Sequence, residues 1–321
     1  MPATEAAALI RVKKLSPVEL TSAVLARIEA LELRVNAYAA LAADQAMADA
    51  QRTEAELGRS DGELGPLHGI PVTIKDLASV EGLPFERGSN IEAGAIGTED
   101  APFVWRLRQA GAIVLGKTTT SEFGWKGVSQ SPRTGITHNP WKEGYNAGAS
   151  SAGAGAAAAA GYGPLHQGSD GAGSIRMPSH FCGIFGIKPS FGRVPNAPVA
   201  NGDQTSHIGP MTRTVADSAL MLQVMSGPHP LDHYSLEAPP ADYPALLSAG
   251  VKGLRVAYSP DLGHARVDDE VAALARKAAG TFADLGANVE EVTPPWGVDG
   301  PDLIRFFWAA HELRYRPYLD D

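Results

Sequence analysis

The sequence predicts an α/β fold, and three observations support this. Apolar runs typical of buried strands, such as 70–74 and 112–115, are interspersed with stretches whose apolar residues recur at helical spacing. Late in the chain, a strand over 254–258, a helix over 268–285 and a strand over 287–292 form a strand–helix–strand unit. With 321 residues, of which 44% are hydrophobic and 20% charged, the chain can bury a sizeable core. We expect helices that cross over between the strands of one sheet.

Three helices have clear signals at their ends. Residues 16–19, Ser-Pro-Val-Glu, form a capping box with proline at the first helical position, and apolar residues then recur at helical spacing as far as Leu31. A second helix is expected over 43–57, followed by Gly58, and a third over 214–225, followed by Gly-Pro. We interpret the first two as an outer cover that carries no chemistry.

Composition excludes several classes of function. The 27 basic and 36 acidic residues give a net charge of −9 without a basic cluster, so no nucleic-acid partner is expected. The single cysteine, Cys182, excludes an internal disulfide and fits a reducing compartment, and its apolar and glycine neighbours predict a buried hydrophobe rather than a nucleophile. The N-terminus lacks the pattern of a signal peptide, and no segment approaches eighteen consecutive apolar residues. We therefore expect a cytoplasmic protein with no membrane partner.

Residues 146–190 contain the densest cluster of glycine, alanine and serine in the chain. Glycine at this density is typical of close backbone approach or unusual backbone conformations. Two turns in this block carry serine, Gly148-Ala149-Ser150-Ser151 and Gly171-Ala172-Gly173-Ser174, and the alanine run between them predicts a short buried helix. We predict a loop–helix–strand–loop assembly that brings two hydroxyls and several backbone N–H groups to one point.

Lys75 closes the apolar strand predicted over 70–74. A lysine in this position is partly desolvated, which lowers its pKa and makes a neutral amine accessible near pH 7. The alternative is a lysine that extends toward water and pairs with Asp76. The local sequence leaves both interpretations open.

Residues 111–118 match the phosphate-binding pattern G-x-x-x-x-G-K-[ST]. That loop needs a strand before it and a helix after it. Here the four residues between the glycines are themselves an apolar strand, and the segment over 118–124 has poor helix propensity. We therefore expect a strand, and a phosphotransferase that uses Lys117 is kept only as an alternative of a different class.

Familiar nucleophile motifs are missing from the sequence. No G-x-S-x-G surrounds Ser150 or Ser174, no S-x-x-K occurs, and His311-Glu312 is not followed by a second histidine one turn later, so there is no zincin helix. Serine chemistry with a non-histidine base remains. Ser174 follows a run whose N–H groups can face a developing oxyanion, Lys75 is the best candidate base, and Ser150 or Ser151 could relay the proton. The alternative for the turn before Ser174 is a tight bend at the start of a helix.

Five segments carry a family resemblance: GIPVTIKDLASVEGLP, GKTTTSEFGWKG, NPWKEGYNAGASSAGAGAAAAAG, GSDGAGSIRMPSHFCGIFGIKPSFGRVP and GPMTRTVADSALMLQVM. On these motifs the chain resembles the amidase signature family of serine hydrolases, from about residue 15 to the end. The resemblance implies a Ser–Ser–Lys triad in which Lys75 is the base, Ser150 follows a cis peptide bond and relays the proton, and Ser174 is the nucleophile. It also places the oxyanion-hole N–H groups at Gly171, Ala172, Gly173 and Ser174.

The same resemblance implies a single domain over 1–321, with its core signature at about 65–226. It implies a central mixed β-sheet flanked by helices on both faces. Family members normally continue well past this length, so the chain that ends at Tyr318-Leu319-Asp320-Asp321 is expected to lack the C-terminal part of the fold. Ala149 and Ala172 are expected to adopt conformations that glycine would adopt more easily.

The function implied is hydrolysis of the C–N bond of a small-molecule carboxylic amide, with no metal or organic cofactor. Two alternatives stay open within the family. One is the glutamine-hydrolysing subunit of a tRNA-dependent amidotransferase, although such subunits typically carry glutamine where this chain has Met177. The other is an inactive, truncated amidase homologue. The sequence also leaves a homo-oligomer open.

Overall fold

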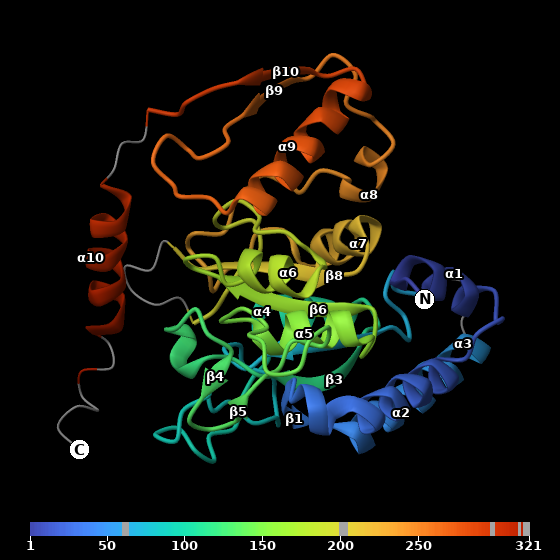
Figure 1. Cartoon of the computed structure of the whole chain (residues 1–321). Helices are drawn as coiled ribbons and strands as arrows, with labels where there is room; N and C mark the ends of the chain where they lie inside the picture. Colours follow the sequence, from blue (N-terminus) through green and yellow to red (C-terminus); the bar gives the residue numbers. More distant parts are fainter. Residues whose placement is uncertain (60–63, 199–204, 296–298, 314–315, 317–321) are drawn as a thin grey trace. The chain divides into compact units, whose positions relative to one another are not determined.

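A computed structural model describes residues 1–59, 64–198, 205–295, 299–313 and 316 (Figure 1). The end of the chain at 318–321, where the fold was expected to be truncated, lies outside the described residues. The chain divides into two compact units, residues 1–244 and 245–321. All the candidate catalytic residues belong to the first unit.

A six-stranded mixed sheet forms the centre of the first unit. In spatial order its strands are β1 (Tyr38–Leu41), β3 (Ile113–Thr118), β2 (Pro71–Lys75), β6 (Leu165–Asp170), β8 (His207–Thr212) and β7 (Phe185–Gly186). β2 runs parallel to both β3 and β6, whereas β1, β8 and β7 run antiparallel to their neighbours. The short strands β4 (Gln130–Ser131) and β5 (Gly135–Ile136) pair separately. The prediction of a central mixed sheet is confirmed.

Helices cover both faces of this sheet, as predicted (Figure 1). On one face, α1 (Ala3–Arg11), α4 (Pro102–Gln109) and α7 (Val215–Met225) share a hydrophobic cluster with the strands. On the other face, a second cluster joins β3 to α2 (Pro17–Val35), α3 (Ala43–Arg59) and α5 (Ala152–Ala160). α6 (Arg176–Cys182) packs against α5. The central strands are therefore buried on both sides, which explains their continuous apolar runs.

Side chains alternate between these two faces. Val72 and Ile74 of β2 belong to the cluster under α4 and α7, and so does Val114 of β3, whereas its neighbours Ile113 and Leu115 belong to the cluster under α5. This is the two-residue period of a strand. The residue after Ile74 is Lys75, which therefore lies on the α5 face of the sheet.

The predicted capping box is present at the start of α2. The Ser16 hydroxyl accepts hydrogen bonds from the N–H groups of Val18 (3.0 Å) and Glu19 (3.2 Å), and the Glu19 carboxylate accepts one from the Ser16 N–H (3.1 Å). α2 runs to Val35, beyond Leu31, and ends where Asn36 takes a left-handed conformation. The helices predicted over 43–57 and 214–225 correspond to α3 and α7.

The alanine run forms α5, and its small side chains let the helix lie close to the sheet. Eight of its nine residues are buried. A Cβ on Gly153 would lie 2.2 Å from the Ala37 carbonyl oxygen and 2.4 Å from the Thr119 nitrogen, so only glycine fits there. The composition of this segment therefore sets how near the start of α5 comes to the strand ends.

The second unit contains the predicted strand–helix–strand element. β9 (Arg255–Tyr258) and β10 (Asn288–Glu291) are parallel and are connected through α9 (Asp269–Asp284), whose N-terminus is capped by the Asp268 carboxylate. The two strands form a sheet of their own rather than joining the six-stranded one. The short α8 (Tyr243–Leu246) lies where the two units meet in the sequence, and α10 (Gly300–Glu312) follows β10.

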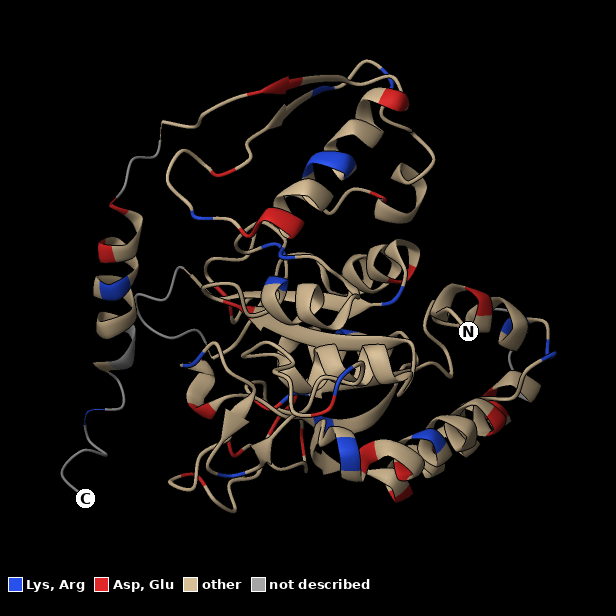
Figure 2. Ribbon diagram, viewed as in Figure 1, with Lys and Arg blue, Asp and Glu red and all other residues tan. Residues whose placement is uncertain are grey.

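Charged side chains are mixed over the described residues rather than gathered by sign. Figure 2 shows acidic and basic residues interspersed along α2 and α3. None of the helices in the described ranges combines the length and the apolar character that a bilayer crossing requires.

Candidate active site

Lys75, at the end of β2, is fully buried. Its Nζ lies 2.7 Å from Ser150 Oγ and 3.0 Å from Ser169 Oγ. Burial lowers the pKa of Lys75 to about 7, and the negative charge of Asp170 only partly opposes this effect. The alternative interpretation, a lysine that reaches water beside Asp76, is wrong. Near pH 7 a large fraction of Lys75 is a neutral amine.

Ser150 lies just before the N-terminus of α5 and is 2% exposed. The Ala149–Ser150 peptide bond is cis, as the family resemblance implies. The 3₁₀ helix η1 (Glu122–Gly124) borders this residue, since a Cβ on Gly124 would lie 3.3 Å from Ser150 Oγ. The sequence did not indicate that this segment would lie beside the site.

Ser174 lies in the turn between β6 and α6 and is 6% exposed. Its carbonyl oxygen accepts a hydrogen bond from the Ser151 N–H (3.2 Å), which joins the two serine-bearing turns directly. The predicted order of loop, helix, strand and loop is present, with Ser150 in contact with Lys75 and the Ser174 backbone bonded to Ser151, the residue after Ser150.

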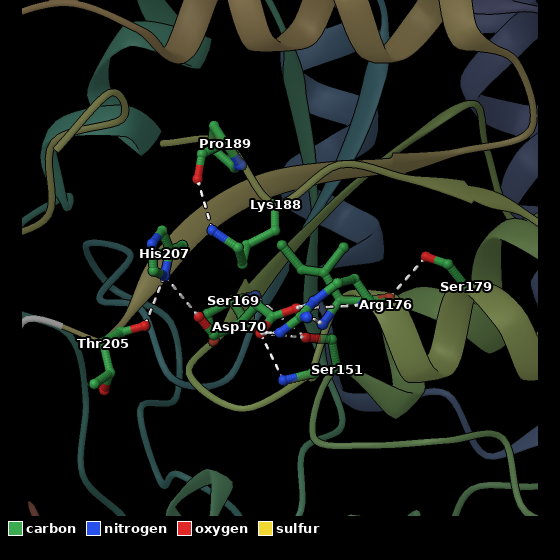
Figure 3. Close-up of polar contacts among 11 residues, drawn as sticks. Ser151, Ser169, Asp170, Arg176, Ser179, Lys188, Pro189, Thr205 and His207 are labelled. Atoms are coloured by element: carbon green, nitrogen blue, oxygen red, sulfur yellow. Dashed lines mark hydrogen bonds and ion pairs between the residues drawn. The ribbon is translucent and has the colours of Figure 1, made fainter. Parts of the chain in front are cut away.

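The Asp170 carboxylate holds the turn that carries Ser174 (Figure 3). It accepts hydrogen bonds from the Gly173 N–H (2.6 Å) and the Ile175 N–H (3.1 Å), and Arg176 donates two more through Nε and Nη2 (both 3.0 Å). Burial acts to raise the pKa of Asp170, but the Arg176 and backbone hydrogen bonds outweigh it and lower the pKa to about 2. The carboxylate is therefore ionised at any physiological pH.

The predicted oxyanion turn has two kinds of N–H group. The Gly173 N–H already donates to Asp170, whereas Ala172 is exposed and Gly171 half-buried, so their backbone lies nearer the surface of the site. Gly173 has a φ of 116°, a conformation that favours glycine. We infer that Gly173 shapes this turn, while the N–H groups of Gly171 and Ala172 are more accessible to a ligand.

The expectation that Ala149 and Ala172 adopt glycine-like conformations is wrong. Neither has a positive φ, whereas the adjacent Gly148 (φ 77°) and Gly173 do. A Cβ on Gly148 would also lie 2.6 Å from the Pro178 Cα. Glycine is thus found at the two positions with a positive φ, and alanine at the neighbouring positions without one.

Sequence reasoning missed Ser169, the second hydroxyl at Lys75. Ser169 and Gln167 lie two residues apart on β6, the strand next to β2, and both contact Lys75. Ser169 contacts the side-chain amine, and Gln167 Oε1 accepts a hydrogen bond from the backbone N–H of Lys75 (2.9 Å). The strand period could have indicated this once β6 was known to lie beside β2.

Ser151, the other candidate relay, has a different set of contacts. Its hydroxyl donates to the Ser169 carbonyl (3.0 Å) and accepts from the Ser169 N–H (3.2 Å). Lys75 contacts Ser150 and not Ser151 in this part of the structure. Ser150 is therefore the better candidate for the relay, and Ser151 holds the end of β6.

His207 also holds the end of β6, from the neighbouring strand β8. Its Nδ1 lies 2.6 Å from the Thr205 carbonyl oxygen and 3.1 Å from that of Asp170 (Figure 3). Asp170 and His207 are directly paired across the two strands. The last residues before the Ser174 turn are thus fixed from both sides.

The segment that resembles a phosphate-binding loop is strand β3. Lys117 is fully buried, and its Nζ donates to Asp76 Oδ1 (3.0 Å) and to the Pro84 carbonyl (2.9 Å). This lysine is therefore engaged inside the protein. The prediction of a strand is confirmed.

Cys182 is a buried hydrophobe, as predicted. Its side chain is fully buried, and burial raises the pKa of the thiol to about 12. Within the described ranges, no three or more His, Cys, Asp and Glu side chains are grouped as metal ligands would be.

The family model described as Amidase matches residues 19–311. The chain therefore belongs to the amidase signature family.

Particular relatives support the same assignment. The chain is 46% identical over 313 residues to an acylamidase of Rhodococcus erythropolis, covering 96% of this chain and 65% of the relative. It is 39% identical over 296 residues to a glutamyl-tRNA(Gln) amidotransferase subunit of Moorella thermoacetica, covering 92% of this chain and 61% of the relative.

Solved structures show the same fold. A bacterial aryl acylamidase of the amidase signature family matches with a TM-score of 0.85 at 31% identity, over 91% of this chain and 61% of that one. The peptide amidase of Stenotrophomonas maltophilia matches with a TM-score of 0.82 at 32% identity, over 91% and 62%. The chain thus spans slightly less than two thirds of the length of these relatives.

Proposed function

We propose that this chain hydrolyses the C–N bond of a small-molecule carboxylic amide through an acyl-enzyme on Ser174. The observation that carries the proposal is the contact of 2.7 Å between Lys75 Nζ and Ser150 Oγ. Lys75 is fully buried and its pKa is lowered to about 7, so it can act as a base near neutral pH. Membership of the amidase family and the 46% identity to an acylamidase support the same reaction.

The proposed proton path runs through two hydroxyls. Neutral Lys75 accepts the proton of Ser150, and Ser150 accepts that of Ser174 while Ser174 Oγ attacks the amide carbonyl carbon. As the tetrahedral intermediate collapses, the C–N bond breaks and the proton returns through Ser150 to the leaving amine. Water then attacks the ester carbonyl by the reverse relay, which releases the carboxylic acid and restores Ser174.

Backbone N–H groups of the turn 171–174 are proposed to hold the oxyanion. Gly171, Ala172 and Ser174 are the better candidates, because the Gly173 N–H already donates to Asp170. A well-placed donor of this kind stabilises the transition state by about 3 kcal/mol. Asp170 and Arg176 contribute by holding the turn in shape rather than by contacting the substrate.

The first test is the Ser174→Ala variant. We expect it to lose all amide turnover and all covalent labelling by a fluorophosphonate, because the attacking oxygen is gone. A matched control is Ser179→Ala, which removes another buried serine hydroxyl, one that donates to the carbonyl of Ile175 (2.7 Å), the residue before α6. Labelling that persists in Ser174→Ala contradicts the assignment of the nucleophile. If the wild-type chain is not labelled either, the result supports the alternative that this chain is an inactive homologue.

A glutamine-hydrolysing subunit is the second candidate function, since 39% identity connects the chain to a subunit of a glutamyl-tRNA(Gln) amidotransferase. The side chain of Met177 favours the amidase. A Cβ on Gly173 would lie 3.3 Å from Met177 Cγ and Cε, so this apolar side chain lies beside the turn that carries Ser174. A ratio of kcat/KM that favours aliphatic or aryl amides over glutamine supports the amidase, and the reverse ratio supports the amidotransferase.

Two further expectations remain proposals. The single buried cysteine with its raised thiol pKa is compatible with a cytoplasmic location. Homo-oligomerisation stays a prediction, which the molar mass of the purified chain in solution will test.

A further inference from the structure

Ser169 has no role in the proposed triad, yet its hydroxyl touches the proposed base. The distance from Lys75 Nζ is 3.0 Å to Ser169 Oγ and 2.7 Å to Ser150 Oγ. Lys75 is fully buried, so bulk water does not supply further partners for its amine. Two hydroxyl oxygens therefore form the polar surroundings of Nζ.

The chemistry of a neutral amine makes the second hydroxyl important. Such an amine has two N–H groups and one lone pair, and only the lone pair can accept a proton. The amine can rotate about its last C–N bond, so an N–H group could face Ser150 instead of the lone pair. An acceptor at a second, fixed position disfavours the orientation in which the lone pair faces that acceptor, and so increases the share of amines whose lone pair faces Ser150.

Resting on the proposed function, we propose that Ser169 is a positioning residue that accepts an N–H of Lys75 and thereby directs the amine lone pair at Ser150. Ser150 is then oriented for proton transfer before the substrate arrives. After the transfer, the resulting ammonium group can donate to both hydroxyls. Ser169 acts only through Lys75 and does not need to contact the substrate.

The backbone of Ser169 is held firmly enough for this role. The Ser151 hydroxyl accepts from the Ser169 N–H (3.2 Å) and donates to the Ser169 carbonyl (3.0 Å). Figure 3 shows Ser151, Ser169 and Asp170 close together at the end of β6. The next residue, Asp170, is held by Arg176 through its carboxylate and by His207 through its carbonyl. The backbone position from which the Ser169 side chain extends is therefore fixed.

The direct contacts of the Lys75 amine are neutral hydroxyls, and few charged groups act on it. Asp170 from β6 is the charged group that influences it, and Asp170 is itself paired with Arg176 from α6. The helix that packs above, α5, has the sequence AGAGAAAAA and contributes no titratable side chain. Replacing Ser169 thus changes the hydrogen bonding of Lys75 without changing a charge.

The test uses Ser169→Ala, Ser169→Thr and the control Ser226→Ala in the full chain. Ser226 is a buried serine whose hydroxyl donates to the Leu222 carbonyl (2.7 Å) on the α7 side of the sheet, so its loss matches Ser169→Ala in size but not in place. We expect Ser169→Ala to lower the maximal kcat about 10-fold. Ser169→Thr keeps the hydroxyl and should restore most of the rate, and Ser226→Ala should match the wild type.

A second readout separates positioning from a general loss of structure. The ammonium form of Lys75 loses an acceptor in Ser169→Ala, so the pKa of Lys75 should fall and the rising limb of the pH–rate profile should move to lower pH. A loosened site that admits water would raise this pKa toward that of an ordinary lysine. Titration of ¹³Cε-labelled lysine by NMR measures the same pKa without turnover, and the Lys75 signal is the one missing from Lys75→Met.

The outcomes distinguish the two proposals. A lower kcat with a lower Lys75 pKa, both restored by threonine, supports Ser169 as the positioning residue. An unchanged or raised Lys75 pKa in Ser169→Ala overturns it, whatever the rate does. If the wild-type chain does not hydrolyse amides while the NMR titration still shifts as expected, the contact of Ser169 with Lys75 stands and the proposed function fails.

Discussion

Lys75 and Lys117 lie at the ends of two neighbouring parallel strands, and both are fully buried. Burial lowers the pKa of each. Their partners differ: Lys75 Nζ lies between two serine hydroxyls, whereas Lys117 Nζ donates to the Asp76 carboxylate at 3.0 Å and to a backbone carbonyl. A buried lysine without a carboxylate partner is suited to accept a proton, and one with such a partner is suited to hold the structure together.

The register of the two strands creates this difference. Lys75 is paired with Thr118, and Ile74 is paired with Lys117. Because consecutive side chains of a strand alternate, Lys75 faces α5 and the serine-bearing turns. The next residue, Asp76, points to the opposite face, where it contacts Lys117. Lys117 is thus paired one residue before Lys75 along β2, and this places the candidate catalytic lysine and the structural lysine in different surroundings.

Among changes to these two lysines and Asp76, the largest expected effect on activity comes from Lys75→Met, which keeps the length of the side chain and removes the amine. We expect kcat for amide hydrolysis to fall by about 10³-fold or more, because general-base assistance is lost. Stability should not fall, since burying an amine is itself unfavourable. Steady-state kinetics and urea unfolding measure the two effects. A variant that keeps more than a tenth of the wild-type kcat rules out Lys75 as the base.

Lys117→Met should have the opposite pattern. It leaves Asp76 buried without its partner, which we expect to cost about 3–5 kcal/mol of unfolding free energy. The folded fraction should retain most of its activity, because Lys117 does not touch Ser150 or Ser174 in the described structure. Urea denaturation gives the free energy, and active-site titration corrects the rate for the folded fraction.

The double variant Asp76→Leu with Lys117→Met is the control for this prediction. Removing both charges together should recover much of the lost stability, since a buried ion pair can be replaced by apolar side chains at little cost. If the double variant is as unstable as the single one, packing rather than the unpaired carboxylate explains the loss.

A smaller effect is expected from Asp76→Asn, at about 1–2 kcal/mol near neutral pH. Lys117 can then respond by losing its proton, because burial already lowers its pKa. In this variant the unfolded chain would bind a proton on Lys117 that the folded chain does not bind, so stability should rise with pH between the folded and unfolded pKa values. Urea unfolding at several pH values tests this slope, and a stability that falls with pH contradicts it.

Much of the fold was predictable because it depends on local patterns. The capping box at Ser16, the apolar strand before Lys75 and the alanine run of α5 each have a direct signal in the sequence. The strand at Lys117 was also predictable, because the four residues that would form a phosphate loop are too apolar for one. The family resemblance then implied the mixed sheet and the candidate triad.

The remaining details depend on which strands are neighbours. Ser169 faces Lys75 only because β6 lies next to β2, and Lys117 meets Asp76 only because β3 lies on the other side of β2. The hydrogen bond from Gly173 to Asp170 similarly requires the geometry of the turn. A single sequence shows the alternation within each strand but not the order of strands or their register.

The central claim, that neutral Lys75 is the base, is tested most directly by the pH–rate profile of amide hydrolysis by the wild-type chain. Measured from pH 5 to 9 with an aryl acylamide, kcat/KM should rise about tenfold per pH unit on the acid side and level off above a midpoint near pH 7, where Lys75 loses its proton. Lys75→Met should lack this rise. A wild-type profile that is flat through pH 7, or one that falls as the pH increases, contradicts the account.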